Sequence, residues 1–438
     1  MTAPTDVYKT LDLALRIGEL LLSSGAGAAD VSAQMDNVAR ACGLRGHSAD
    51  VTFTELAMSH QSQPDEPALI QLRQVRQRQV DYEDLTLVDH LVRDLVAGTV
   101  GRDDAATRLN RIVSSGHARP RWSVTFGLGV MGAGVGVVLG GNWVVVLIAF
   151  VAASCIDLIQ RGMTRSRWPA FYQQMAGGFF ATMLAATVAS LGVAVAPSRV
   201  ITASIVLLLA GVSFLGAIQD ALTGFPLTAN ARILEAIIAT AGAIAGVSGG
   251  LTFARVLGIG LGTLDPGAIH LAAVPLMALG SAVAAAAYAF SSYVHYRALL
   301  PIAVVAAAGA ALFRVGVQHQ VGVAWASGVA AVLIGVLSHY AAARIRVPAL
   351  VLVTAAIVPL LPGLSIYRGL ALFGVGGGSG GLLAMFTAAA TAIALSAGVI
   401  LGQYVAQPVA LEGRKRERKL AGPRLVGPPT VRALRRRR

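Results

Sequence analysis

The chain has 438 residues, of which 55% are hydrophobic and 13% are charged, and its mean hydropathy of +0.67 excludes an ordinary water-soluble protein. The net charge is +13. Residues 1–121 hold 13 basic and 16 acidic side chains, residues 122–411 hold 11 basic and 4 acidic ones, and residues 412–438 hold 11 basic and 2 acidic ones. Because the excess lies in membrane loops and a basic tail, we expect membrane lipids as partners and no nucleic acid.

The sequence pattern of residues 1–118 predicts a small α/β domain at the N-terminus. Apolar residues at helical spacing indicate one helix that ends near Gly25 and a second that starts near Asp30 as its N-cap. Two extended runs and two further helices follow, at residues 49–61, 68–76, 82–98 and 102–115, in an ααββαα order. Since the first hundred residues lack the apolar core of a signal peptide, we expect this domain in the cytoplasm.

Ten apolar spans begin at Trp122, and most have about the 20 residues that cross a bilayer core. They cover residues 122–139, 142–159, 171–194, 199–219, 231–257, 269–292, 298–315, 321–340, 347–361 and 380–403. The ninth is short, and the Gly-rich stretch after it has the character of a broken helix. The sequence therefore predicts a polytopic α-helical membrane protein with ten transmembrane helices.

An even number of spans places both termini on one side of the membrane. The loops predicted inside hold Arg161, Arg165, Arg167, Arg297, Arg344 and Arg346, and those predicted outside hold Arg199, Arg314 and Arg368. The bias favours cytoplasmic N and C termini. The basic tail, residues 406–438, is then cytoplasmic and is expected to be disordered.

The spans divide into two halves of five, residues 119–262 and 263–405. An odd number in each half gives related halves opposite orientations, which is the inverted-repeat architecture of many secondary transporters. The fourth span runs into "VSFLGAIQDALTG" and the ninth into "VPLLPGLSIYRGL". Each half thus has a break followed by a charged residue at the same place.

Three separated stretches, "LLSSGAGAADVSAQMDNVARACGL", "QDALTGFPLTANARILEA" and "PLLPGLSIYRGL", resemble the threonine/serine exporter family of bacterial inner-membrane proteins. The resemblance covers roughly residues 10–405. It implies a cytoplasmic α/β domain joined to ten transmembrane helices, and proton-driven export of threonine and serine without enzymatic activity or a cofactor. Homo-oligomerisation is left open. The first break departs from the family pattern, because it has Leu215-Gly216 where related members often carry Pro-Gly.

Asp220, Arg232 and Glu235 are the main candidates for the substrate and proton pathway. A charge at membrane depth costs at least about 2.5 kcal/mol and usually faces a cavity or a partner. Arg232 and Glu235 are three residues apart and can pair on one helix face. Asp220 would bind a substrate ammonium or a proton. The alternative is that Asp220 caps a helix end and the other two lie at the headgroup level.

Asp157 precedes Arg161 by four residues, which favours an intrahelical ion pair at the interface over a group that titrates as protons cross. The second break supplies the other candidates, Pro362, Gly363, Tyr367 and Arg368. Arg368 would bind a substrate carboxylate, or would anchor the outer interface.

Other function classes have weaker sequence support. A membrane-embedded aspartyl protease would use Asp157 and Asp220, but the Tyr-Asp and Gly-x-Gly-Asp motifs of such enzymes are absent. The histidines of the N-terminal domain lack metal-ligand spacing, so no metal is expected. A sensor or scaffold role for residues 1–118 stays open.

Overall fold

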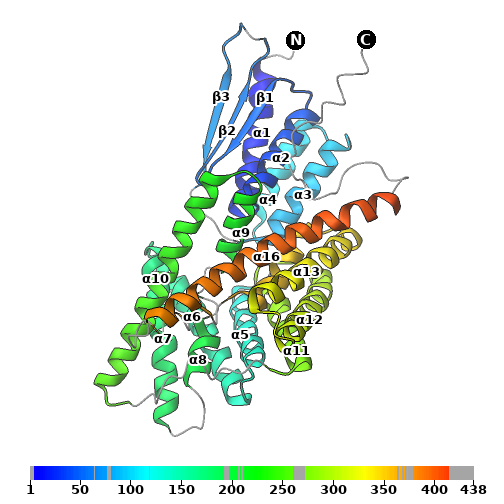
Figure 1. The fold of residues 1–438 in the computed structure, drawn as a ribbon. Helices are drawn as coiled ribbons and strands as arrows, with labels where there is room; N and C mark the ends of the chain where they lie inside the picture. Colours follow the sequence, from blue (N-terminus) through cyan, green and yellow to red (C-terminus); the bar gives the residue numbers. More distant parts are fainter. Residues whose placement is uncertain are drawn as a thin grey trace. The chain divides into compact units, whose positions relative to one another are not determined.

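The computed structural model describes residues 4–63, 65–75, 80–117, 119–191, 197–205, 208, 211–259, 272–362, 365–366, 369, 372 and 378–413 (Figure 1). These residues form two compact units. The first contains residues 4–116 together with Gln219–Asn230, and the second contains His117–Ile218 and residues 231–413. Gln219–Asn230, which joins the fourth and fifth predicted spans, therefore belongs to the first unit. The sequence did not indicate this.

The first unit combines helices with one antiparallel sheet in the order β1-β2-β3. Its elements are α1 (Pro4–Ser23), α2 (Ala28–Ala41), β1 (His47–Val51), β2 (Glu55–His60), β3 (Leu69–Gln74), α3 (Tyr82–Val96) and α4 (Arg102–Ser115). Leu56 and Met58 alternate with less buried neighbours on β2 and pack into the core. Gly18 of α1 leaves room for Met35 of α2 and for Leu56, so the two helices and the sheet meet closely.

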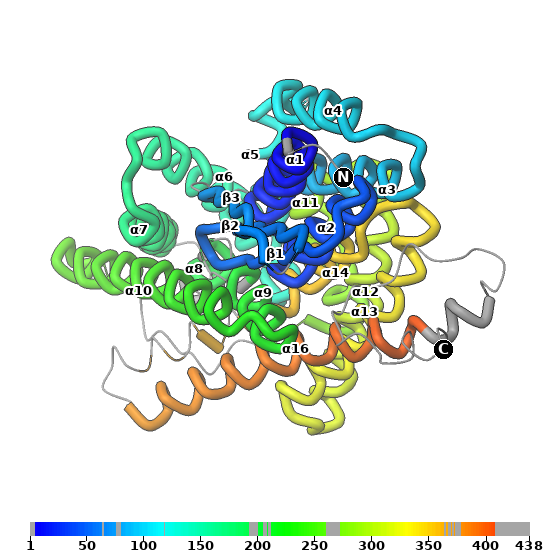
Figure 2. Tube along the Cα trace, turned by 90° about the horizontal axis from the view of Figure 1, so that it is seen from above, coloured from blue at the N-terminus to red at the C-terminus, as the bar shows by residue number. Residues whose placement is uncertain are grey.

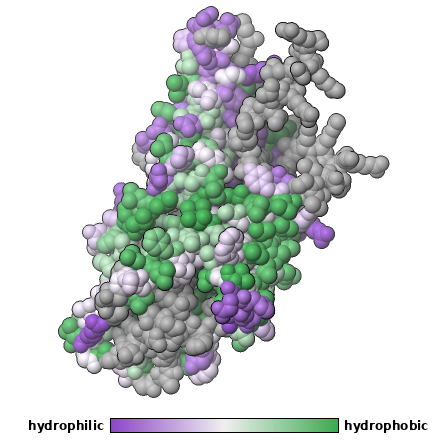
Figure 3. Space-filling model, in the orientation of Figure 1, coloured by the Kyte–Doolittle hydropathy of each residue, from purple (hydrophilic) through white to green (hydrophobic). Residues whose placement is uncertain are grey.

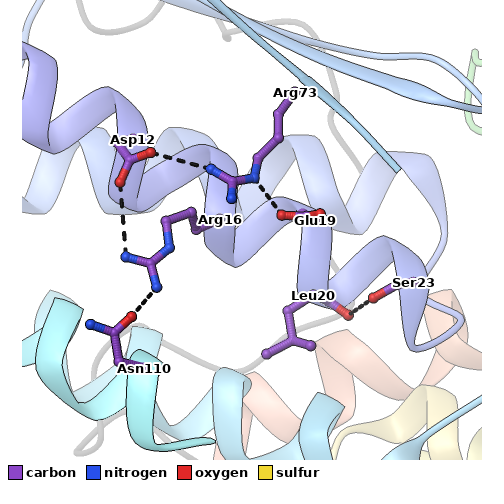
Figure 4. Close-up of polar contacts among 7 residues, drawn as sticks. All are labelled: Asp12, Arg16, Glu19, Leu20, Ser23, Arg73 and Asn110. Atoms are coloured by element: carbon purple, nitrogen blue, oxygen red, sulfur yellow. Dashed lines mark hydrogen bonds and ion pairs between the residues drawn. The ribbon is translucent and has the colours of Figure 1, made fainter. Parts of the chain in front are cut away.

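Polar contacts join the exposed side of α1 to its neighbours (Figure 4). Arg73 of β3 lies 3.2 Å from Asp12 and pairs with Glu19. Arg16 donates a hydrogen bond to Asn110 of α4. These residues are at least partly solvated, so each pair adds little stability and chiefly fixes how the elements are oriented.

Two predictions for the first unit need correction. The expected run over residues 49–61 is two strands, because Thr52 donates from its backbone N–H (2.9 Å) and its hydroxyl (3.1 Å) to Glu55 O and turns the chain. The alternating pattern continues through this turn and hides it. Helix α2 also begins at Ala28 with Gly27 as N-cap, so Asp30 lies in the first turn rather than at the cap.

Seven helices of the second unit, among the described residues, are long and apolar enough to cross a membrane. They are α5 (Arg121–Val138), α6 (Trp143–Arg165), α10 (Pro226–Val256), α11 (Val274–Ser291), α12 (Tyr296–Gln318), α13 (Val323–Ile345) and α16 (Gly378–Gly413). Exposed Leu and Ile side chains such as Leu234 and Ile237 of α10 cover them, and hydrophobic residues gather on the face drawn in Figure 3. This surface suits contact with lipid.

Three predicted spans are not among these seven helices. The third is α7 (Ala170–Ser190), a single helix of 21 residues with Tyr172, Gln173 and Gln174 near its start. The fourth is described as two helices, α8 (Pro197–Ile205) and α9 (Gly211–Leu222). The ninth is α14 (Ala349–Ile357) with the 3-10 turn η2 (Val358–Leu360). At about 1.5 Å per residue, the 21 residues of α7 are long enough to cross a hydrocarbon core of about 30 Å, whereas α8, α9 and α14 are each too short to do so alone.

Glycines allow three helix pairs of the second unit to approach closely. A Cβ atom at Gly134 of α5 would lie 2.8 Å from Ala284 N of α11. One at Gly178 of α7 would lie 2.6 Å from Ala243 O of α10, and one at Gly335 of α13 would lie 2.6 Å from Val399 O of α16. Figure 2 shows α7 beside α10 and α13 beside α16. Small residues at crossings are typical of helix packing in membranes, where close backbone approach stabilises association.

Candidate functional site

Asp220 lies near the end of α9 and is only 1% exposed. Its Oδ1 accepts a hydrogen bond of 2.8 Å from the backbone N–H of Ala28, the first residue of α2, 192 positions earlier in the chain. Both residues belong to the first unit. Gly27, the N-cap of α2, has no side chain to offer, so Asp220 supplies the acceptor that an N-terminal N–H of a helix needs.

The turn between α9 and α10 surrounds this aspartate. Phe225 N–H donates to Asp220 O at 2.8 Å, and Gly224 takes the positive φ of 93° that the turn requires. Two residues into α10, the Thr228 hydroxyl donates to Val51 O of β1 at 3.4 Å. The turn is therefore held to both α2 and the sheet of the first unit.

Arg232 lies on α10 beyond this turn, in the second unit, and is 8% exposed. Its Nη1 is 2.6 Å from the position that a Cβ atom would take at Gly216 of α9. The glycine of the first break thus leaves space for a buried guanidinium. Next to it, Leu215 O accepts a hydrogen bond of 3.5 Å from the Ser396 hydroxyl, which brings α16 to the same break.

Glu235 does not share the environment of Arg232. It is exposed, whereas Arg232 is buried. Among the described residues no ion pair joins the two. Although three positions apart on α10, they separate because the guanidinium turns toward Gly216 on α9.

Asp157 sits in a small polar cluster between α5 and α6. Its Oδ2 lies 2.8 Å from Arg161 Nη2 and accepts a hydrogen bond of 2.8 Å from the Thr125 hydroxyl. The arrangement is the intrahelical pair that the four-residue spacing favours. Thr125 was missed, and an uncharged residue within an apolar span has no sequence signal to reveal it.

Two family models match the sequence of this chain. Residues 12–254 match a model described as "Putative threonine/serine exporter", and residues 277–405 match one described as "Threonine/Serine exporter, ThrE". The chain belongs to the threonine/serine exporter family. The family is one of exporters, and the seven long apolar helices among the described residues agree with a multi-pass membrane protein.

Two relatives in the exporter family align over most of the chain. A protein of Mycobacterium tuberculosis (strain ATCC 25618 / H37Rv) named "Probable threonine/serine exporter" is 36% identical over 432 residues, which is 97% of this chain and 81% of that protein. A "Threonine/serine exporter" of Corynebacterium glutamicum is 31% identical over 413 residues, 93% and 84% of the two chains. No solved structure matches.

The first matched region ends within α10 and the second begins within α11, so the predicted boundary between the two halves falls in the interval between them. Of the second break, Pro362 lies two residues after the end of η2. Gly363, Tyr367 and Arg368 lie outside the described residues. The structure thus brings Arg232 to Gly216, Asp220 to α2, and Asp157 to Arg161, as three separate arrangements.

Arg119 is a further residue that sequence reasoning missed. At the entry to α5 it donates to Phe290 O at 2.6 Å and to Val294 O, near the end of α11. Its guanidinium carbon lies 4.7 Å from the Phe290 ring centroid and 4.4 Å from that of Tyr296. The contact satisfies carbonyls at a helix end and adds cation–π attraction, so it fixes the start of the membrane unit.

Proposed function

We propose that this protein exports small polar amino acids, principally threonine and serine, across the bacterial inner membrane. The observation that carries the proposal is the match to relatives named threonine/serine exporters over 97% and 93% of the chain. We further propose that the proton gradient drives export and that both termini are cytoplasmic. The abundance of apolar helices supports transport within the membrane itself.

An inverted repeat is the proposed architecture of the membrane unit. The first helices of the two halves, α5 and α11, contact each other reciprocally, because a Cβ at Gly134 would meet Gly280 O and one at Gly280 would meet Gly134 O. The third and fifth helices of each half, α7 with α10 and α13 with α16, also cross at glycines. Equivalent pairs with the same type of crossing are what two related halves would produce.

Arg232 is the proposed partner for the substrate carboxylate. A buried cation among apolar helices is costly and usually marks a pathway, and a guanidinium binds a carboxylate through paired hydrogen bonds. Gly216 provides the space in which it is held. We assign the matching role in the second half to the break at Pro362, Gly363, Tyr367 and Arg368.

The acidic candidates receive different roles. The Asp157 carboxylate is already bound by Arg161 and Thr125, and Glu235 is exposed. Asp220 accepts the N–H of Ala28. We therefore propose that the substrate is bound first through its carboxylate, with the freed backbone of the breaks supplying acceptors for its ammonium group.

Threonine efflux from cells tests the function. A strain without the gene is loaded with a threonine dipeptide, and efflux is compared after return of the wild-type gene, Arg232→Gln or Arg255→Gln. Arg255 is an exposed arginine on the same helix and is the matched control. We expect export with wild type and Arg255→Gln, and a loss of about tenfold with Arg232→Gln, since a charged hydrogen bond contributes roughly 1.5–3 kcal/mol.

Each component of the proposal has its own negative outcome. Equal efflux with and without the gene would reject threonine as substrate. Efflux that persists after a protonophore collapses the proton gradient, with the sodium gradient kept, would reject proton coupling. Full efflux by Arg232→Gln would leave the family assignment intact and remove Arg232 from the pathway.

A further inference from the structure

The N-terminus of α2 lacks a cap of its own. Gly27 has extended backbone angles (φ −72°, ψ 153°) and, as glycine, offers no side-chain acceptor. The Asp220 carboxylate replaces this acceptor and also brings a negative charge to the positive end of the helix dipole. A Cβ at residue 27 would lie 3.3 Å from Asp220 Oδ1, so the glycine permits the carboxylate to approach.

Helix α9, which contains Asp220, and helix α10, which follows the turn, both continue out of the first unit. Gln219–Asn230 belongs to the first unit, whereas the rest of α9, from Gly211, and of α10, to Val256, belongs to the second. Arg232 is two residues beyond this segment. The turn is therefore continuous with the two helices that carry Gly216 and Arg232.

We propose that Asp220 is a positioning residue that caps α2 and thereby holds the α9–α10 turn to the N-terminal part of the first unit, and that export requires this attachment. The first unit then controls the transport helices through the turn, with Thr228 bound to Val51 as the second point of attachment. The inference rests on the proposed function only for its efflux measurement, because the cap itself is a property of the fold.

Ala28→Pro removes the donor of this hydrogen bond without changing Asp220. Proline is well accepted at the first position of a helix, and Gly27 already has the extended conformation that a residue before proline needs. Ala28→Gly keeps the N–H and is the matched control. On the acceptor side, Asp220→Ala removes the oxygen, whereas Asp220→Asn keeps an oxygen that caps equally well and loses the charge.

Two measurements on the full-length protein test the proposal. Hydrogen exchange over the peptide that begins α2 should be about fivefold faster in Ala28→Pro and Asp220→Ala than in wild type, and unchanged in Asp220→Asn and Ala28→Gly. Threonine efflux per inserted molecule should fall several-fold in the first pair and be retained in the second pair. Retained efflux in Asp220→Asn would show that export needs the capping oxygen and not the negative charge.

Other outcomes overturn the proposal. If exchange in Asp220→Asn equals wild type but efflux is lost as in Asp220→Ala, transport needs the carboxylate charge and not the cap. If Ala28→Pro speeds exchange but exports at the wild-type rate, the attachment has no role in transport. If exchange is the same in all variants, Asp220 does not cap α2. Absence of threonine export by the wild type leaves the exchange result intact and contradicts only the proposed substrate.

Discussion

The guanidinium of Arg232 lies against Gly216, at 2.6 Å from the position of a Cβ atom on that residue. A side chain at 216 and the observed arginine position exclude each other. The first break therefore needs glycine at position 216 to leave space for the guanidinium, although Leu215 and not proline precedes it. The relationship also connects α9 and α10 through a charge that both helices bury.

Gly216→Ala should displace the guanidinium while the rest of the chain inserts normally. We expect the KM for threonine efflux to rise about tenfold, because a charged hydrogen bond contributes roughly 1.5–3 kcal/mol. Gly162→Ala on α6, where a Cβ would meet nothing within 4 Å, is the matched glycine substitution and should behave as wild type. An unchanged KM in Gly216→Ala would show that the position of Arg232 does not govern substrate binding.

Asp157→Asn should have little effect. Asparagine still accepts from Thr125, and an ion pair at 13% and 23% side-chain exposure is partly screened, so its loss costs roughly 1 kcal/mol or less. Efflux should stay within about twofold of wild type, as it should in Arg161→Gln. Complete loss of efflux in Asp157→Asn but not in Arg161→Gln would instead indicate a carboxyl that titrates during transport.

Arg119→Lys should destabilise the membrane unit. Lysine keeps the charge but lacks the planar fork that reaches Phe290 O and Val294 O together. Losing one charged hydrogen bond and part of the cation–π contact should cost about 2 kcal/mol, measured as thermal unfolding in detergent. Arg121→Lys, at an exposed position two residues later, is the control. Equal melting temperatures would show that the contact adds nothing to stability.

Gly134→Ala should weaken the crossing of α5 and α11. The new methyl group would lie 2.8 Å from Ala284 N, so the helices must separate at a cost of about 1–3 kcal/mol. Gly280→Ala should have a similar effect, and the double variant should be less than additive because both act on one crossing. Gly136→Ala, whose methyl would lie 3.4 Å from Val146 Cα, is the milder comparison. Wild-type stability of both variants would contradict the close crossing.

Cys42 should react slowly with thiol reagents at neutral pH. Burial raises the pKa of its thiol, although nearby Arg102 opposes the shift, so the reactive thiolate is scarcer than in a free cysteine. In a Cys155→Ser background, the labelling rate should be lower in the folded than in the unfolded protein at pH 7.5 and should rise as the pH approaches the raised pKa. Equal rates in both states would contradict the shift.

Local signals predicted much of the first unit. The helices at Tyr82–Val96 and Arg102–Ser115 agree with their apolar spacing, and Gly25 follows the end of α1 in the left-handed conformation that favours glycine. The hairpin at Thr52 was missed because its strands keep one alternating pattern. The start of α2 was misplaced because its cap comes from Asp220, far along the chain.

The candidate site was only partly accessible from sequence. The four-residue spacing predicted the ion pair of Asp157 with Arg161, and Arg232, singled out as a rare charge in an apolar span, is buried. The space at Gly216 and the hydroxyl of Thr125 were not foreseeable, since neither carries a charge. The partner of Asp220 is a backbone N–H, which every non-proline residue possesses, so no residue type marks it.

The cap on α2 has a consequence for how this chain is synthesised and dissected. The first unit is not complete at residue 116, because it also contains Gln219–Asn230. On the ribosome, α2 waits for its acceptor until the chain reaches Asp220, 192 residues after Ala28, and α5, α6 and α7 are made in between. A fragment cut after residue 118 would keep α1 to α4 and β1 to β3 and still lack the carboxylate that caps α2.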